Sequence, residues 1–142
     1  MKSVYTFGPI YISGENYLPV YKKLNIICSK YFDKVISTYP DFWDSKETPS
    51  DFWNRTYNTI TKCDLFIAEC SSPSHGVGME LMMGREHNIP VIALVKDDVE
   101  DFERSTMILG LPNLKKLLKY KDYDDLSQKL EKELKAFSEV FN

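Results

Sequence analysis

The sequence has few of the residues that build disulfide frameworks and zinc sites. Only three of its 142 residues are cysteines, Cys28, Cys63 and Cys70, and no two of them form a CxxC pair. An odd set without paired spacing predicts neither a disulfide framework nor a zinc site. Cys28 and Cys63 lie at apolar helical positions, where we expect buried, reduced thiols. No metal site is therefore expected.

Positive charge and long apolar runs are also scarce. The chain has 18 Lys and Arg against 21 Asp and Glu, which gives a net charge of -3. Non-specific affinity for DNA or RNA needs a basic surface, so a nucleic-acid polymer is not an expected partner. No apolar run approaches the roughly 20 residues of a membrane-spanning helix, and residues 1–7, MKSVYTF, lack the apolar core of a signal peptide. We therefore expect a cytoplasmic protein that does not associate with membranes.

Length and composition leave room for one hydrophobic core. Hydrophobic residues make up 43% of the 142 residues, so we expect a single domain over 1–142. Short apolar runs alternate with helical patterns. Runs such as LFIAE and VIALV are continuously apolar, which is typical of strands covered on both faces. The expected strands are residues 3–7, 34–37, 65–69 and 91–95, with a fifth at 117–120.

Amphipathic helices are expected between and after these strands. The second is expected over 49–62 with Ser50 or Asp51 as its N-cap, the third from Val77 onward, and the last after Asp122 as N-cap. The first helix has apolar or aromatic side chains three and four residues apart, at Tyr17, Tyr21, Leu24, Cys28 and Tyr31. The last helix has an apolar stripe at Leu126, Leu130, Leu134 and Phe137.

The alternation of strands and helices predicts the fold class. Such strands pair in parallel through right-handed crossovers, so we expect an α/β fold with a doubly wound, flavodoxin-like or Rossmann-like sheet of about five mostly parallel strands and helices on both faces. Ligands of these sheets bind beyond the carboxyl ends of the strands. The first strand leads into FGPIYISGEN and the third into CSSPSHGVGME. These two loops converge on one crevice if the two strands are neighbours.

Glycines in the two loops favour a bound ligand. Gly8, Gly76 and Gly78 would let the backbone approach a ligand closely, and the amides that open the third helix would face it. The sequence has no GxxxxGK[ST] motif and does not complete GxGxxG after Gly76. A nucleoside-triphosphate hydrolase and a dinucleotide dehydrogenase are therefore disfavoured.

Glu80 follows GVGM, where phosphate-binding loops usually have a lysine or a neutral residue. One interpretation is an ordinary acid in the first turn of a helix, where it complements the helix dipole. The other is a carboxylate aimed into the crevice, where it attacks a sugar carbon and forms a covalent glycosyl intermediate. Spacing alone leaves both interpretations open.

Three segments, in order, resemble the nucleoside 2-deoxyribosyltransferase family, and within it the 2'-deoxynucleoside 5'-phosphate N-hydrolases. YTFGPI at 5–10 resembles the opening strand and loop of the family. CDLFIAECSSPSHGVGMELMMGREHNIPVIAL at 63–94 resembles its central block. STMI at 105–108 is similar to a Ser-x-Met-Ile segment of the nucleotide-hydrolase branch. The resemblance covers most of the chain, from Tyr5 to about Ile108.

The resemblance implies cleavage of the N-glycosidic bond of (2'-deoxy)nucleoside 5'-monophosphates through a glutamyl-sugar intermediate. The products are the free base and (deoxy)ribose 5-phosphate, and no cofactor is implied. Glu80 matches the nucleophile, and Tyr5 matches the tyrosine whose hydroxyl holds the carboxylate in line. Ser74 and the backbone of Gly76 and Gly78 match the 5'-phosphate cradle.

Further matches concern the sugar, the base and a second subunit. The resemblance implies that Ser105 reaches the phosphate from a neighbouring subunit, and so implies a homodimer with a shared active site. The loop that lines the sugar and base is matched by Gly8, Pro9 and Ile10. His75, inside the phosphate loop, could contact phosphate or base. Aromatic residues near the second strand could stack on the base or form a lid or subunit contact. They are Tyr39, Phe42, Trp43 and Trp53.

The sequence departs from the family at two positions. Thr56 stands where the family usually has an aspartate that assists sugar positioning and proton transfer, with Asn54 and Asp51 nearby. Tyr11 stands where some phosphate-specific members have an arginine. A nucleotide hydrolase is favoured, but two alternatives remain. One is a nucleoside 2-deoxyribosyltransferase that exchanges bases, and the other is a nucleotide-binding sensor without turnover.

Overall fold

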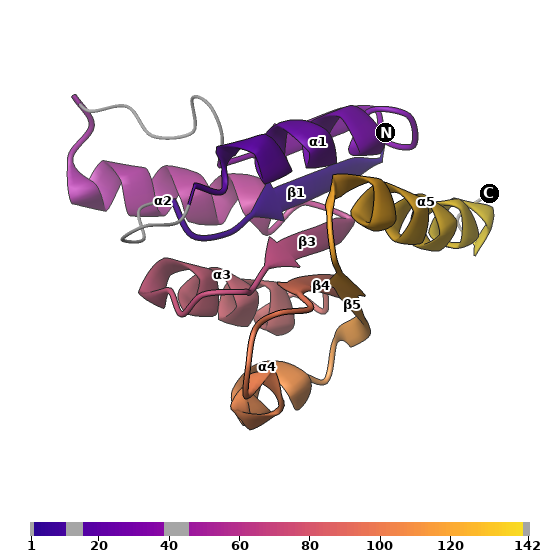
Figure 1. The fold of residues 1–142 in the computed structure, drawn as a ribbon. Helices are drawn as coiled ribbons and strands as arrows, with labels where there is room; N and C mark the ends of the chain where they lie inside the picture. The colour runs from indigo at the N-terminus through magenta and orange to yellow at the C-terminus, as the bar shows by residue number, and fades with distance from the viewer. Residues whose placement is uncertain (1, 11–15, 39–45, 141–142) are drawn as a thin grey trace.

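A five-stranded, all-parallel sheet forms the centre of the computed structural model, which describes residues 2–10, 16–38 and 46–140 (Figure 1). The strand order is β2-β1-β3-β4-β5, so β1 and β3 are neighbours and the expected flavodoxin-like sheet is confirmed. The strands are β1 (Ser3–Phe7), β2 (Lys34–Ser37), β3 (Leu65–Glu69), β4 (Val91–Lys96) and β5 (Leu114–Tyr120).

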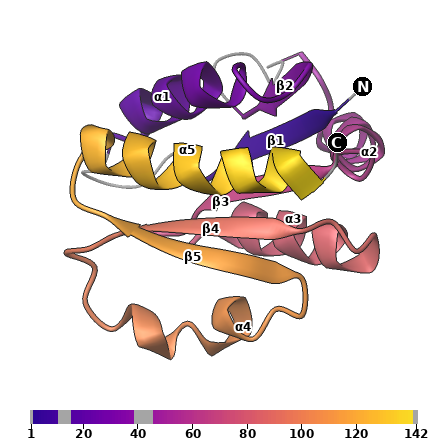
Figure 2. The same ribbon diagram turned by 90° about the vertical axis from the view of Figure 1, so that its right-hand side faces the viewer.

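Helices cover both faces of this sheet. Figure 2 shows α1 and α5 side by side on one face and α3 on the other. The helices are α1 (Leu18–Cys28), α2 (Pro49–Ile60), α3 (His75–Glu86), the short α4 (Thr106–Leu109) and α5 (Tyr123–Val140), with a 3-10 turn at Phe102–Arg104. α2 and α3 share a hydrophobic cluster with Tyr5 and Phe66, whereas α1 and α5 pack on Leu65 and Ile67. In the described part of the chain, no helix is long and apolar enough to cross a membrane.

Several expected boundaries shift for local reasons. The N-cap of α2 is Thr48, not Ser50 or Asp51, and its Oγ1 accepts a hydrogen bond from the Asp51 amide at 3.1 Å. Pro49 explains the difference, because a residue before proline is extended, as an N-cap must be, and proline suits the first helical position. α3 begins at His75 rather than Val77, because the Oγ of Ser74 accepts from the Val77 amide.

Of the remaining helix and strand ends, some lie where the sequence predicts them and others do not. Asp122 caps α5 as expected, with Oδ1 accepting from the Asp125 amide at 2.8 Å. α1 ends at Cys28, so Tyr31 lies beyond it in a turn. β5 begins at Leu114 rather than at residue 117, because it is an edge strand whose exposed lysines interrupt the apolar run.

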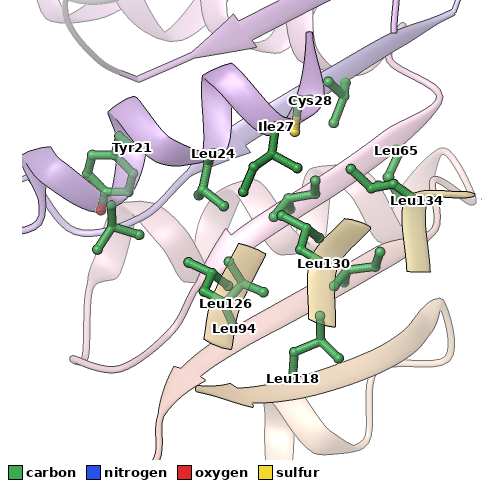
Figure 3. Packing of buried hydrophobic residues seen from close by; sticks show 14 of the residues in the cluster. Tyr21, Leu24, Ile27, Cys28, Leu65, Leu94, Leu118, Leu126, Leu130 and Leu134 are labelled. Carbon is green, nitrogen blue, oxygen red and sulfur yellow. The ribbon is translucent and has the colours of Figure 1, made fainter. Parts of the chain in front are cut away.

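The core is built from the residues that carried the sequence patterns. The stripe residues Leu126, Leu130 and Leu134 of α5 are fully buried and lie against α1 and the sheet (Figure 3). On the opposite face, the ring of Tyr5 stacks on that of Phe7 with centroids 4.6 Å apart. The three cysteines are buried and free, as expected for Cys28 and Cys63, but Cys63 does not lie on a helix because α2 ends at Ile60.

Gly84 sets how closely α3 approaches the sheet. A Cβ at this position would lie 2.6 Å from the Phe66 ring, so Gly84→Ala is expected to destabilise the protein by about 1–3 kcal/mol and lower its melting temperature. Gly78→Ala on the same helix is the matched control, because its Cβ would meet nothing within 4 Å and alanine favours a helix by about 0.5–1 kcal/mol. Equal thermal unfolding of the two variants would contradict this close contact.

Candidate active site

Tyr5 and Glu80 meet at the face of the sheet covered by α2 and α3. The Tyr5 hydroxyl, on β1, donates a hydrogen bond of 3.2 Å to Oε1 of Glu80 on α3. Tyr5 is fully buried and its ring is held by Phe7 and Phe66, whereas Glu80 is only partly buried. The pair therefore places a fixed donor behind a carboxylate that retains access to solvent.

The position of Glu80 on α3 bears on the dipole interpretation. α3 begins at His75, so Glu80 lies beyond the first turn, and no acidic residue stands in that turn. The stabilising effect of the helix dipole falls off within the first turn. The expectation of Glu80 as a first-turn acid is therefore wrong, because the cap at Ser74 starts the helix earlier than the spacing indicated.

Burial changes the acidity of both members of the pair. Burial raises the pKa of Glu80 to about 7, and the hydrogen bond from Tyr5 acts in the opposite direction. Burial, followed by the charge of Glu80, raises the pKa of Tyr5 well above its usual value. Tyr5 therefore stays protonated and donates, while Glu80 exchanges its proton near neutral pH. Carboxyl groups with such pKa values are typical of catalytic sites.

A cavity of about 450 Å³ opens next to the start of α3. It is lined by Ser74 and Gly78, which lie close together in the sequence, and by Ser105, which is distant in the sequence but belongs to the same chain. Gly76 is not among the lining residues, although it is exposed on the first turn of α3. His75 also lines the cavity, and the acidic residues Glu100 and Asp101 lie on its β4–α4 side.

The loop after β1 packs tightly on α1. A Cβ on Gly8 would overlap the Tyr21 hydroxyl and lie 2.8 Å from Cβ of Glu69, so no larger residue fits there. The Tyr21 hydroxyl donates a 2.6 Å hydrogen bond to the carbonyl oxygen of Pro9. Ile10 is 43% exposed. Residues 8–10 therefore form a fixed backbone segment with an exposed apolar end at the carboxyl edge of the sheet.

Of the residues on α2 near the position of the family's usual aspartate, some are buried and others are exposed. Thr56 on α2 is 3% exposed, and its Oγ1 has no hydrogen-bond partner within the described residues. Asn54 and Asp51 are exposed, so α2 turns Thr56 toward the core and these two side chains away from it. Trp53 is 45% exposed and stacks on Tyr57. The expected aromatic contacts of Tyr39, Phe42 and Trp43, and Tyr11 as well, lie outside the described residues.

A polar cluster that was not predicted from the sequence lies on the opposite face of the sheet. Glu69, the last residue of β3, is fully buried and accepts hydrogen bonds from the Ser71 amide and the Tyr120 hydroxyl. The available signal was an acid that ends an otherwise apolar strand. Among the residues that the structure describes, no three His, Cys, Asp or Glu side chains could jointly hold a metal ion.

Comparison with known proteins identifies the family. No protein-family model matches the chain. The chain is 32% identical over 102 residues to a protein of Syntrophotalea carbinolica with the provisional name 2'-deoxynucleoside 5'-phosphate N-hydrolase 1, covering 68% of each chain. A protein of Methanosarcina mazei with the same provisional name is 30% identical over 129 residues, covering 87% of this chain and 76% of the relative.

A solved structure agrees with the fold. The CMP N-glycosidase BcmB of Clostridium botulinum superposes with a TM-score of 0.65 at 18% identity, over 93% of this chain and 99% of that one. At this identity the likeness concerns the fold, and the two sequence relatives carry the assignment. The chain therefore belongs to the nucleoside 2-deoxyribosyltransferase family, in its 2'-deoxynucleoside 5'-phosphate N-hydrolase branch.

Proposed function

We propose that the protein hydrolyses the N-glycosidic bond of 2'-deoxynucleoside 5'-monophosphates through a covalent ester on Glu80. Membership of the family makes the chain an enzyme of the N-glycosidase type. The observation that carries the proposal is the hydrogen bond between the Tyr5 hydroxyl and Oε1 of Glu80, at a carboxylate that is partly buried at the carboxyl edge of the sheet.

The chemistry follows from this geometry. Because Tyr5 occupies Oε1, the other oxygen of Glu80 attacks C1' of the sugar, and the electron pair of the C1'–N bond leaves with the base. The departing base takes a proton from solvent or from a bound water. Thr56 cannot supply this proton, because a threonine hydroxyl is not an acid near neutral pH. Water then attacks C1' of the ester and loses a proton to solvent, which releases deoxyribose 5-phosphate and returns the Glu80 carboxylate.

The cavity beside α3 supports a place for the 5'-phosphate. Ser74 and Ser105 offer hydroxyl groups there, and the backbone amides at the start of α3 would face a bound anion. In this proposal the lack of side chains at Gly76 and Gly78 leaves the start of α3 accessible to the phosphate. The space beside Gly78 is unoccupied, since a Cβ at this position would meet nothing within 4 Å. Residues 8–10 line the sugar and base from the other side of the crevice.

A homodimer in the cytoplasm is part of the proposal. The exposed methionines Met79 and Met82 flank Glu80 on α3 and support a subunit contact beside the site. Ser105 would then contact a phosphate in its own chain or in the partner's. Light scattering coupled to size-exclusion chromatography measures the subunit number, and a monomer at micromolar concentration would remove this part of the proposal.

The test of the proposed function is release of free base from each of the four common 2'-deoxynucleoside 5'-monophosphates, followed by chromatography. We expect release from at least one of them, with a kcat/KM about tenfold or more above that for the matching deoxynucleoside, because hydrogen bonds to a charged group contribute about 1.5–3 kcal/mol each. Addition of a second free base separates the alternatives, since a transferase would form a new nucleoside or nucleotide and a hydrolase would not.

A nucleotide-binding protein without turnover is the second candidate, because Thr56 replaces the usual aspartate. It predicts a rise in melting temperature with a nucleoside monophosphate and no free base after prolonged incubation. Base release by the wild-type protein that Glu80→Gln abolishes would exclude this candidate.

A further inference from the structure

Glu69 places a carboxylate inside an apolar core. It is fully buried at the end of β3, on the face of the sheet that α1 and α5 cover, together with Leu65 and Ile67. Tyr5 lies among the residues of the other face, so Glu69 is not part of the Tyr5–Glu80 pair. Burial of a carboxylate is costly unless hydrogen bonds compensate for the lost hydration. A second function for this residue would explain why the core keeps an acid here.

Short hydrogen bonds occupy both oxygens of Glu69. Oε1 accepts from the Ser71 amide at 2.6 Å, and Oε2 accepts from the Tyr120 hydroxyl at 2.5 Å. Burial raises the pKa of Glu69, while these two bonds and the charge of Lys96 act in the opposite direction. The carboxylate therefore ties Ser71, the second residue after β3, to Tyr120 at the end of the edge strand β5.

The same cluster holds the next residues of the loop that begins at Ser71. Oγ of Ser71 accepts from the Lys96 amide at the end of β4, at 2.8 Å. The hydroxyl groups of Ser72 and Tyr17 share a 2.6 Å hydrogen bond, and the Lys96 ammonium lies 4.8 Å from the centre of the Tyr17 ring. Residues 71 and 72 are thus anchored to β4, to β5 and to the beginning of α1.

The loop after β1 lies against the same carboxylate. A Cβ on Gly8 would come within 2.8 Å of Cβ of Glu69, and Tyr21, which closes over Gly8, donates to the carbonyl oxygen of Pro9. Tyr21, labelled in Figure 3, belongs to a buried cluster that also contains Tyr120. Both walls of the crevice therefore meet at Glu69, on the side of the sheet away from the reacting carboxylate.

We propose that Glu69 is a positioning residue, which holds residues 71–74 against residues 8–10 so that Ser74 and the start of α3 are in place before a nucleotide binds. The inference rests on the proposed function, because it assigns the phosphate to that loop. Binding groups that are already in position lose little conformational entropy when the ligand binds. A misplacement of a reacting or binding group by about 1 Å can lower the rate about a hundredfold. A hydrophobic residue would fill the core equally well but would leave the Ser71 amide without its acceptor.

The test compares Glu69→Gln and Tyr120→Phe with the wild-type protein. Glu69→Gln keeps the size and removes the charge, and Tyr120→Phe removes a single hydroxyl. Asn113→Ala is the matched control, because Asn113 is also buried, and its amide donates at 2.6 Å to the Ile89 carbonyl oxygen beside the amino ends of β4 and β5, away from the carboxyl ends where Glu69 and Tyr120 lie. The quantity measured is the ratio of kcat/KM for a deoxynucleoside monophosphate to that for the matching deoxynucleoside.

Both variants are expected to lower this ratio about tenfold, mainly through KM for the monophosphate, while Asn113→Ala leaves it within about twofold even at the same loss of melting temperature. In nuclear magnetic resonance spectra, the Ser71 amide should move upfield and exchange faster in Glu69→Gln. If Glu69→Gln does not fold, Tyr120→Phe carries the test.

An unchanged ratio in folded Glu69→Gln and Tyr120→Phe, or an equal decrease in Asn113→Ala, would overturn the inference. A wild-type protein that releases no base would count against the proposed function instead. Titration of each protein with the four deoxynucleoside monophosphates then still tests Glu69. Weaker binding in both variants than in Asn113→Ala supports the positioning role, and equal binding removes it.

Discussion

Glu80→Gln is expected to lower the rate of base release from a deoxynucleoside monophosphate by about a thousandfold or more, the order of loss seen when a nucleophile is removed. Glutamine keeps the shape and still accepts the hydrogen bond of the Tyr5 hydroxyl, but its amide has no negative charge with which to attack C1'. The measurement is chromatography of the released base under single-turnover conditions. Glu86→Gln, an exposed acid on the same helix, is the control and should keep full activity.

The same substitution is expected to stabilise the fold above neutral pH. Burial raises the pKa of Glu80 from 4.5 to about 7, so the folded protein favours the protonated acid, and stability is lost as the pH rises from about 4.5 to 7. Glu80→Gln removes this cost, which is on the order of 3 kcal/mol at pH 8, and should raise the melting temperature at pH 8 but not at pH 4.5. Retained activity in both Glu80→Gln and Glu80→Ala would remove Glu80 as the nucleophile.

The pH dependence of kcat/KM is expected to follow the ionisation of Glu80. The attacking form is the carboxylate, so kcat/KM should rise with pH to a plateau, with a midpoint near 7 and a value at pH 5 about a hundredfold below the plateau. Tyr5→Phe removes the hydrogen bond that lowers the pKa of Glu80, so its midpoint should move to higher pH and its plateau should fall.

Tyr57→Phe provides the control for the pH profile, because Tyr57 lies half-buried on α2, where its ring stacks on Trp53 and lies edge-on to His87. It should keep the wild-type midpoint and plateau. The profile is measured in one set of overlapping buffers at constant ionic strength. A flat profile between pH 5 and 8, or an unmoved midpoint in Tyr5→Phe, would show that an ionising Glu80 does not control the reaction.

Local patterns in the sequence were sufficient for most of the secondary structure. The strands that become β1, β2 and β3 have the predicted bounds, because each is a short run that contains β-branched or aromatic side chains. The beginning of β5 was not predicted, since exposed lysines interrupt the apolar run in this edge strand, whereas its end at Tyr120 was. The cap at Thr48 was missed because the effect of Pro49 on the preceding residue outweighs the general preference for serine or aspartate.

Some features of the candidate site could be predicted from the sequence, and others required the tertiary structure. The sequence by itself determined the fold class, the family resemblance, and the loops that contain Gly8, Ser74 and Glu80, because strand ends and helix starts are encoded by neighbouring residues. Only the tertiary structure decided that Tyr5 donates to Glu80, that Ser105 lines a cavity with Ser74, and that Glu69 is buried beneath both loops. These features depend on which distant segments pack together and on how much water they exclude, and the pKa of Glu80 follows from that burial rather than from any local pattern.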